Sequence, residues 1–117
     1  MSYVDGFVLA VQKAKLEDYL VMAQTGCAVW KEHGALAYVE CVADDVPYGE
    51  LTSFPRAVQA TDDEVVVFSW IVYESREQRD AVNAKVMADP RLKPDPGGMP
   101  FDGKRMIYGG FKTIVEL

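Results

Sequence analysis

The stretch Glu64-Val-Val-Val-Phe-Ser-Trp-Ile-Val-Tyr73 decides the fold of this chain. Because successive side chains of a β-strand point to opposite faces of a sheet, its residues divide into two sets. One face would carry Val65, Val67, Ser69, Ile71 and Tyr73, and the other Val66, Phe68, Trp70 and Val72. Both sets are apolar and rich in β-branched and aromatic residues, which is typical of a central strand covered on both sides.

Length and charge narrow the class of protein. The chain has 117 residues, which predicts one domain over residues 1–117, and a formal net charge of −6. This acidic balance disfavours nucleic acid and anionic lipid as partners, and no apolar run approaches the roughly 20 residues of a membrane span. Cys27 and Cys41 lie in apolar contexts without ligand-like spacing. We therefore expect two buried thiols in a cytoplasmic protein that needs no structural metal.

The segments around the central stretch alternate between strand and helix patterns. We expect further strands at Tyr3–Val11, Ala35–Val42 and Arg105–Lys112, amphipathic helices from about Ala14 to His33 and from Ser75 to about Asp89, and a short helix at Phe54–Ala60. The apolar stripe of the first long helix would be Leu16, Tyr19, Leu20, Ala23, Cys27 and Trp30. Gly34 is placed to end that helix, and Ser75 with Gln78 has the form of a capping box.

The order β-α-β-β-α-β predicts an α+β, ferredoxin-like fold. Right-handed crossovers place both helices on one face of a four-stranded antiparallel sheet with strand order 4-1-3-2. The other face would then expose some of Phe7, Leu9, Val66, Phe68 and Trp70, a patch too large for a typical monomer. We therefore predict a two-fold homodimer with the sheets packed face to face, although the pattern leaves open which face turns inward.

Several motifs in order carry a resemblance to a known family. They include Tyr3-Val-Asp-Gly-Phe7, Trp30-Lys-Glu-His-Gly-Ala-Leu36, Leu51-Thr-Ser-Phe-Pro-Arg-Ala-Val58 and Met99-Pro-Phe-Asp-Gly-Lys-Arg-Met-Ile-Tyr-Gly-Gly-Phe111. Across essentially the whole chain, the sequence resembles the small bacterial proteins designated domain of unknown function 1428. The resemblance implies a dimeric α/β barrel, in a superfamily that also holds antibiotic-biosynthesis-type monooxygenases and haem-degrading enzymes. It implies no activity.

Three residues are weak candidates for catalysis. His33, the only histidine, could act as a base or a metal or haem ligand, or could simply interact with the helix dipole in the last turn. Asp5 and Glu40 are carboxylates in mid-strand, and with Ser69 they could converge on a cavity where one acts as a base. The alternative is that Asp5 and Glu40 face solvent or pair with Lys or Arg.

Aromatic and basic residues suggest a ligand site. Trp70, Phe68, Tyr38 and Tyr108 could line a pocket for a flat ligand, or could serve core and dimer packing instead. Arg56, Lys104 and Arg105 could form an anion-binding rim or pair with Asp44, Asp45 and Asp102. The loop Asp95–Lys104, with Gly97 and Gly98, could cup an anion but does not match a phosphate-binding motif.

Three functions remain open from these patterns. The first, which we favour, is a dimer that binds a small molecule in its barrel, without a cofactor. The second is a cofactor-independent monooxygenase-type enzyme that uses Trp70, Tyr38, His33 and Asp5 or Glu40. The third is a purely structural or interaction module. The contents of the cavity discriminate among them. A filled, dry interface favours the third, an open pocket with a buried carboxylate or His33 favours the second, and an apolar pocket without a titratable group favours the first.

Overall fold

A computed structural model describes residues 1–92 and 98–117. The elements are β1 (Tyr3–Gln12), the 3-10 turn η1 (Lys13–Lys15), α1 (Leu16–Glu32), β2 (Ala37–Val42), α2 (Phe54–Ala57), β3 (Glu64–Tyr73), α3 (Arg76–Met87), the 3-10 turn η2 (Pro90–Leu92) and β4 (Ile107–Lys112). The predicted order of elements is confirmed. β4 begins two residues later than expected, because Asp102–Arg105 forms a turn in which the Arg105 N–H donates to the Asp102 carbonyl at 3.2 Å.

The four strands form one antiparallel sheet in the order β2-β3-β1-β4, which is the predicted order read from the opposite edge. β1 and β3 pair along their whole length, from Tyr3 opposite Tyr73 to Gln12 opposite Glu64. The two strands that are apolar on both faces are therefore the two central strands.

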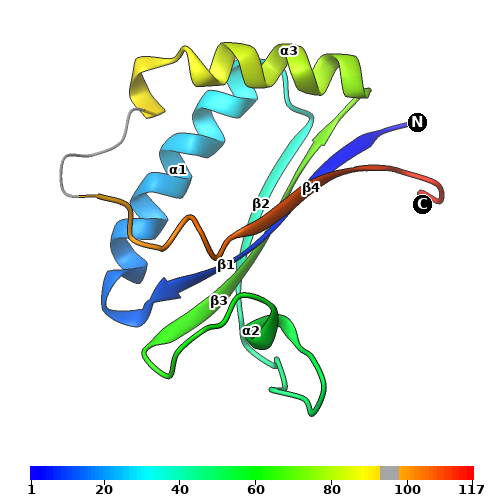
Figure 1. Cartoon of the computed structure of the whole chain (residues 1–117). Coiled ribbons are helices and arrows are strands. Elements are labelled where there is room, and N and C mark those ends of the chain that lie inside the picture. Colours follow the sequence, from blue (N-terminus) through cyan, green and yellow to red (C-terminus); the bar gives the residue numbers. More distant parts are fainter. Residues whose placement is uncertain (93–97) are drawn as a thin grey trace.

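Helices α1 and α3 lie on the same face of the sheet (Figure 1). This face carries the odd-numbered residues of the central strands, a choice that the sequence pattern left open. The core between the layers consists of Tyr3, Leu9, Val11, Val67, Ile71 and Tyr73 from the sheet and Tyr19, Ala23, Val29, Val82 and Val86 from the helices.

The buried stripe of α1 differs from the predicted one. Tyr19 and Ala23 are buried as expected, but the stripe continues through Gly26 and Val29. Leu20 is 55% exposed, because it lies about 100° round the helix from Tyr19. The prediction that Leu20 faces the core is therefore wrong.

The second face of the sheet is covered at one end only. Val58, which follows α2, packs on Val8, Ala10 and Val66 there. Beyond this corner the face is open and apolar, and Phe68, Ile107 and Phe111 are 41%, 47% and 64% exposed.

Cys41 is exposed and Cys27 is partly exposed, so the prediction of two buried thiols is wrong. The reason for Cys41 is that β2 is an edge strand and Cys41, opposite Phe68, lies on the open face.

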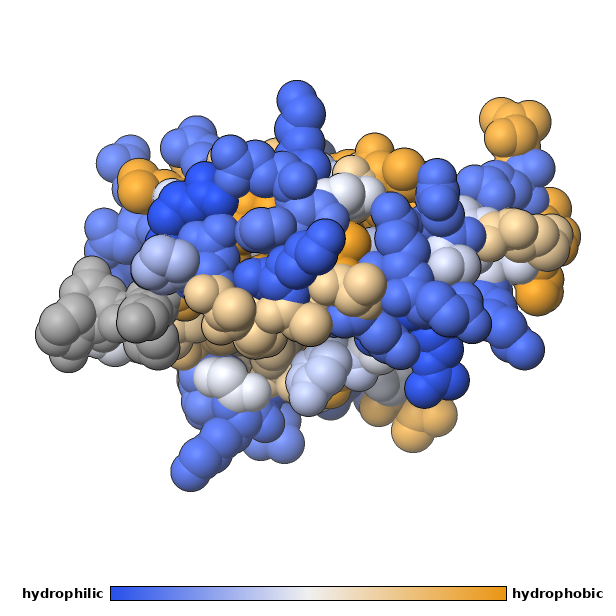
Figure 2. Space-filling model, turned by 90° about the horizontal axis from the view of Figure 1, so that it is seen from above, coloured by the Kyte–Doolittle hydropathy of each residue, from blue (hydrophilic) through white to orange (hydrophobic). Residues whose placement is uncertain are grey.

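The surface on the helix-bearing side differs in hydropathy from the open face of the sheet (Figure 2). Hydrophilic side chains cover most of it, and apolar atoms lie in the gaps between them and at the end where the two chain termini lie. Within residues 1–92 and 98–117, no helix is long and apolar enough to cross a membrane.

Candidate functional site

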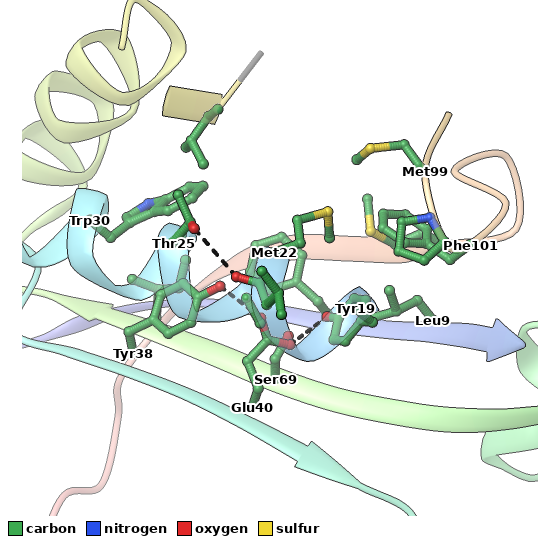
Figure 3. A pocket seen from close by; sticks show the side chains of 18 of the residues that line it. Leu9, Tyr19, Met22, Thr25, Trp30, Tyr38, Glu40, Ser69, Met99 and Phe101 are labelled. Carbon is green, nitrogen blue, oxygen red and sulfur yellow. Dashed lines mark hydrogen bonds between the residues drawn. The ribbon is translucent and has the colours of Figure 1, made fainter. Parts of the chain in front are cut away.

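A pocket of about 840 Å³ lies between α1 and the helix-bearing face of the sheet (Figure 3). Strands β1, β2 and β3 contribute its sheet side through residues such as Leu9, Glu40 and Ser69. Helix α1 contributes Met22 and Trp30, among others. The end of α3, η2 and the described part of the following loop complete the lining with Val86, Leu92, Met99 and Phe101. The fold therefore has, beside its packed core, a pocket that opens to solvent and that the described side chains do not fill.

The polar centre of this pocket is the Glu40 carboxylate. The Tyr19 hydroxyl donates to Glu40 Oε1 at 2.5 Å, and the Tyr38 hydroxyl donates to Glu40 Oε2 at 2.7 Å (Figure 3). Each carboxylate oxygen thus has one phenol donor. Because a carboxylate has about four lone-pair sites, Glu40 can still accept further hydrogen bonds from a ligand.

Local structure explains why these groups meet. Tyr38 and Glu40 are two residues apart on β2, so their side chains share the face towards α1. Ser69 lies directly opposite Glu40 on β3 and is 7% exposed. Gly26 on α1 leaves room for the Tyr38 hydroxyl, because a Cβ at position 26 would lie 2.9 Å from that oxygen.

The two phenols remain protonated donors. Burial and the adjacent Glu40 carboxylate raise the pKa of Tyr19 and of Tyr38 well above the ordinary value for tyrosine. Neither hydroxyl can therefore act as a base near neutral pH. The only group in this trio that can accept a proton is Glu40.

Two aromatic pairs flank the carboxylate. The Trp30 and Tyr38 rings lie 5.8 Å apart between centroids, and the Tyr19 and Phe101 rings lie 5.9 Å apart in an edge-to-face arrangement. Figure 3 shows Trp30 with Tyr38 on one side of Glu40 and Tyr19 with Phe101 on the other. The site is therefore a carboxylate between aromatic walls.

The Trp30 ring is held from behind by a polar cluster on α3 and β3. Its indole N–H lies 3.0 Å from the Tyr73 hydroxyl and 3.4 Å from Asn83 Oδ1. Burial and the charge of nearby Asp5 raise the pKa of Tyr73. Because the indole N–H already has partners, Trp30 offers a ligand mainly its ring.

Asp5 does not reach the pocket. Its Oδ1 accepts a hydrogen bond from Arg79 Nη1 on α3 at 2.9 Å, and its side chain is 8% exposed. Burial raises the pKa of Asp5, partly offset by the Arg79 guanidinium. The expected convergence of Asp5 with Glu40 and Ser69 is thus found for Glu40 and Ser69 only, and Asp5 follows the alternative reading, a pair with arginine.

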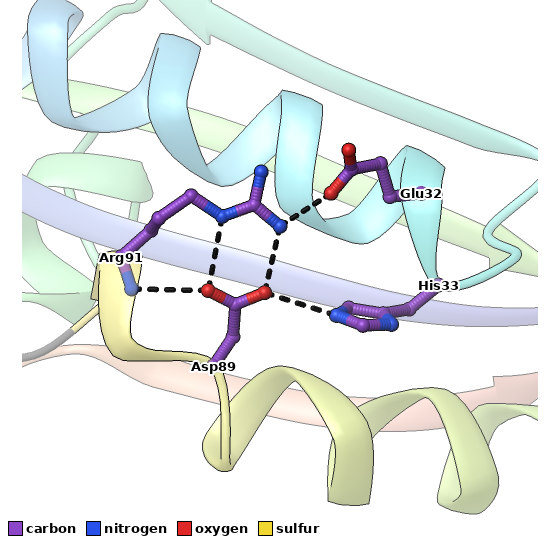
Figure 4. A network of polar contacts seen from close by, with 4 residues as sticks. All are labelled: Glu32, His33, Asp89 and Arg91. Atoms are coloured by element: carbon purple, nitrogen blue, oxygen red, sulfur yellow. Dashed lines mark hydrogen bonds and ion pairs between the residues drawn. The ribbon is translucent and has the colours of Figure 1, made fainter.

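His33 also lies outside the pocket lining, in a network with Asp89, Arg91 and Glu32 (Figure 4). His33 Nε2 lies 3.1 Å from Asp89 Oδ2, and Arg91 Nε donates to Asp89 Oδ1 at 3.0 Å. These contacts with Arg91 and His33 hold the pKa of Asp89 well below its usual range. The network ties η2 to the end of α1.

Metal ligation finds no support in the described part of the chain, where no group of three or more His, Cys, Asp or Glu side chains could hold an ion.

The predicted ligand-binding residues separate onto different surfaces. Tyr38 lines the pocket, whereas Trp70 borders it from β3 but lies by register on the open face, with its ring 5.7 Å from that of Phe68. Tyr108 is 73% exposed and stacks near Phe7 on the helix side. The aromatic residues thus do not form one common wall.

The basic residues do not form the suggested anion-binding rim. Arg56 donates to the carbonyls of Tyr48 and Gly49, and its guanidinium lies 3.9 Å from the Tyr48 ring centroid. Arg105 pairs with Asp102, one of the acidic partners that the sequence analysis named as the alternative. It also pairs with Glu64, a contact that the sequence analysis did not predict. Part of the Asp95–Lys104 loop, including Gly97, lies outside the described residues.

The sequence reasoning missed Tyr19 and Trp30 as site residues, because both fit the apolar stripe of α1. The polar atom on each of these rings could have identified them as site residues. A buried Tyr hydroxyl or Trp N–H needs a partner, so aromatic residues of this kind in a stripe point to a polar group opposite them.

Comparisons with known proteins agree with the sequence resemblance. Residues 2–103 match the family described as "Protein of unknown function (DUF1428)". The chain belongs to the DUF1428 family. It is 56% identical over 116 residues to the uncharacterized protein YbaA of Escherichia coli K12, covering 99% of each chain, and equally similar to YbaA of Shigella flexneri.

Solved structures support the fold of this DUF1428 protein. An uncharacterized NIPSNAP domain protein from Burkholderia xenovorans is similar with a TM-score of 0.55 at 14% identity, over 95% of this chain and 93% of that one. A NIPSNAP family protein of unknown function from Agrobacterium tumefaciens is similar with a TM-score of 0.50 at 14% identity, over 94% and 84%. At this identity the likeness concerns the ferredoxin-like fold alone.

Proposed function

We propose that this protein binds a small, largely apolar molecule in the pocket between α1 and the sheet. The observation that carries the proposal is the 840 Å³ volume, which is within the usual range of about 300–1,000 Å³ for ligand pockets. A lining of aromatic and aliphatic side chains around a few convergent polar groups is also typical of such sites.

A fluorescent apolar probe tests this binding. We expect N-phenylnaphthylamine, which is neutral and apolar, to gain fluorescence with the wild-type protein. Thr25, on the pocket side of α1, lines the cavity, so Thr25→Phe should weaken probe binding by about tenfold or more by filling it. Gln24 is exposed on the same helix, and Gln24→Phe is the matched control that should bind normally. Equal loss in both variants, or no binding by the wild type, would refute the proposal.

The second candidate function is an enzyme of the cofactor-independent monooxygenase type. One observation favours it, namely a carboxylate with free lone pairs inside the pocket, which could accept a proton from an electron-rich substrate. Asp5 and His33 take no part, since neither lines the pocket. Oxygen uptake with a hydroquinone probe that is lost in Glu40→Gln and retained in Glu17→Gln would support this candidate, and equal rates in both variants would exclude it.

We also propose that the protein is a homodimer, in which two copies cover each other's open sheet face. Apart from Glu64, which pairs with Arg105, the strands place no charged side chain on this face. It exposes Phe68, Ile107 and Phe111, so burial against an identical face would remove a large apolar area from water. The pocket lies on the opposite face and stays available in such a pair.

Free thiols, including the exposed Cys41, fit a reducing cytoplasmic location.

A further inference from the structure

In the described part of the chain, the Glu40 carboxylate has hydrogen-bond donors but no cationic partner. Among residues 1–92 and 98–117, none of the ion pairs involves Glu40, although seven other pairs are formed. Its two donors, Tyr19 and Tyr38, are neutral phenols. A partly buried carboxylate without a counter-charge is unfavourable, and a positively charged group placed beside it would relieve that cost.

Two basic residues of the described chain border the pocket, Arg91 and Lys15. Arg91 borders it but is paired with Asp89 and Glu32. Lys15 also borders it and is exposed in η1, at the start of α1. Neither forms an ion pair with Glu40, so within residues 1–92 and 98–117 no basic side chain neutralises the carboxylate.

The walls beside Glu40 suit a cation as well. Trp30 with Tyr38, and Tyr19 with Phe101, present aromatic rings on two sides of the carboxylate (Figure 3). The faces of aromatic rings attract organic cations, Trp most strongly. The net charge of −6 adds a long-range attraction for positive ligands.

We propose that the ligand of this pocket is a protonated amine with an apolar, ring-containing body. The ammonium group donates to the free lone pairs of Glu40, and the apolar body occupies the space lined by Met22, Met99 and Leu9. The two phenol donors keep the carboxylate in place for this contact. This inference rests on the proposed small-molecule function and adds the chemical class of the ligand.

The same geometry selects against anions. A carboxylate ligand in this position would face Glu40, and both phenol hydroxyls already point at Glu40 and cannot serve it. Like charges at close range in a pocket of low dielectric repel strongly. An amine, an alcohol and an acid of the same shape should therefore bind in that order.

Isothermal titration calorimetry with three matched probes tests the proposal. Naphthylmethylamine, naphthylmethanol and naphthoate share one ring system and differ in charge. At pH 7 we expect the wild type to bind the amine about tenfold or more tighter than the alcohol, with the acid weakest. In Glu40→Gln, which keeps the size of the side chain and removes its charge, the preference of amine over alcohol should disappear.

Two further variants separate a local effect from a general one. Glu17→Gln removes one exposed negative charge from α1 and should keep the amine preference, which controls for long-range attraction. Glu40→Asp keeps the charge on a shorter stem and should retain part of the preference, which controls for loss of folding. A preference that survives in Glu40→Gln, or an alcohol that binds the wild type as tightly as the amine, overturns the amine assignment while leaving the pocket proposal standing. Failure of all three probes to bind overturns both.

Discussion

At the scale of single residues, the ion pair of Arg105 with Glu64 links the segment before β4 to the start of β3. Arg105 Nη1 donates to Glu64 Oε1 at 2.8 Å and Nη2 donates to Oε2 at 2.6 Å, a bidentate arrangement. The Thr61 backbone N–H adds a third hydrogen bond at 2.8 Å, and the Glu64 side chain is 6% exposed. The hydrogen bonds from Arg105 lower the pKa of Glu64 to about 2.

This pKa predicts the sign of a pH effect on stability. Since the folded pKa of Glu64 is below its ordinary value of 4.5, the pair stabilises the fold above about pH 4.5 and is lost as the pH falls towards 2. Glu64→Gln should lower the free energy of unfolding by about 1–3 kcal/mol at pH 7. The difference in free energy of unfolding between the wild type and this variant should become smaller below pH 4.5. Urea denaturation at several pH values measures this. Glu17→Gln is the control. A loss of stability in Glu64→Gln that does not change with pH would contradict the link between the Glu64 pKa and stability.

At the scale of elements, the ends of the helices follow their sequence signals closely. Gly34, at φ 112°, ends α1, with Ala35 N–H donating to the Trp30 carbonyl at 3.0 Å and Gly34 N–H to the Lys31 carbonyl at 3.2 Å. The Ser75 hydroxyl caps α3 by accepting from the Gln78 N–H at 3.1 Å. The Gln78 side chain accepts from the Glu74 N–H rather than from Ser75, and donates to the Gly34 carbonyl, so it joins the two helix ends.

Gly34 gives a test of the α1 terminus. A side chain is disfavoured at this positive φ, so Gly34→Ala should lower the free energy of unfolding by about 1–3 kcal/mol. Gly103→Ala is a matched control, because its Cβ would meet nothing within 4 Å and the backbone there has ordinary φ. Urea denaturation of both variants gives the comparison. If both substitutions change the free energy of unfolding equally, the positive φ at Gly34 does not disfavour a side chain, and the prediction is wrong.

At the scale of the whole molecule, the sheet separates two surfaces of different character. One face holds the pocket under α1, and the other is open except where Val58 covers its corner. The Phe111 ring lies over Gly6 and Gly109 on the open face, since a Cβ at either glycine would meet its Cε1 at 3.9 or 3.6 Å. An aromatic residue exposed over such a flat surface is a suitable anchor for a second copy.

Two substitutions on β4 test the dimer. Phe111→Glu places a charge on the open face and should raise the dissociation constant of the dimer by about tenfold or more. Tyr108→Glu places the same charge on the same strand, at a residue 73% exposed on the helix side, and should leave the dimer intact. Analytical ultracentrifugation distinguishes these results. A monomeric wild-type protein would show the dimer proposal to be wrong.

The sequence by itself determined the element order, the strand order and the two central strands, because these follow from local periodicity and from the handedness of crossovers. It also marked Glu40 and Tyr38 as candidates. Only the tertiary structure brought Tyr19, 21 residues earlier in the chain, to Glu40, and Asp5 to Arg79, 74 residues later. The register of the sheet and the rotation of α1 decide such contacts, and a pattern that repeats along one element contains no information about which side chain of another element will lie opposite it.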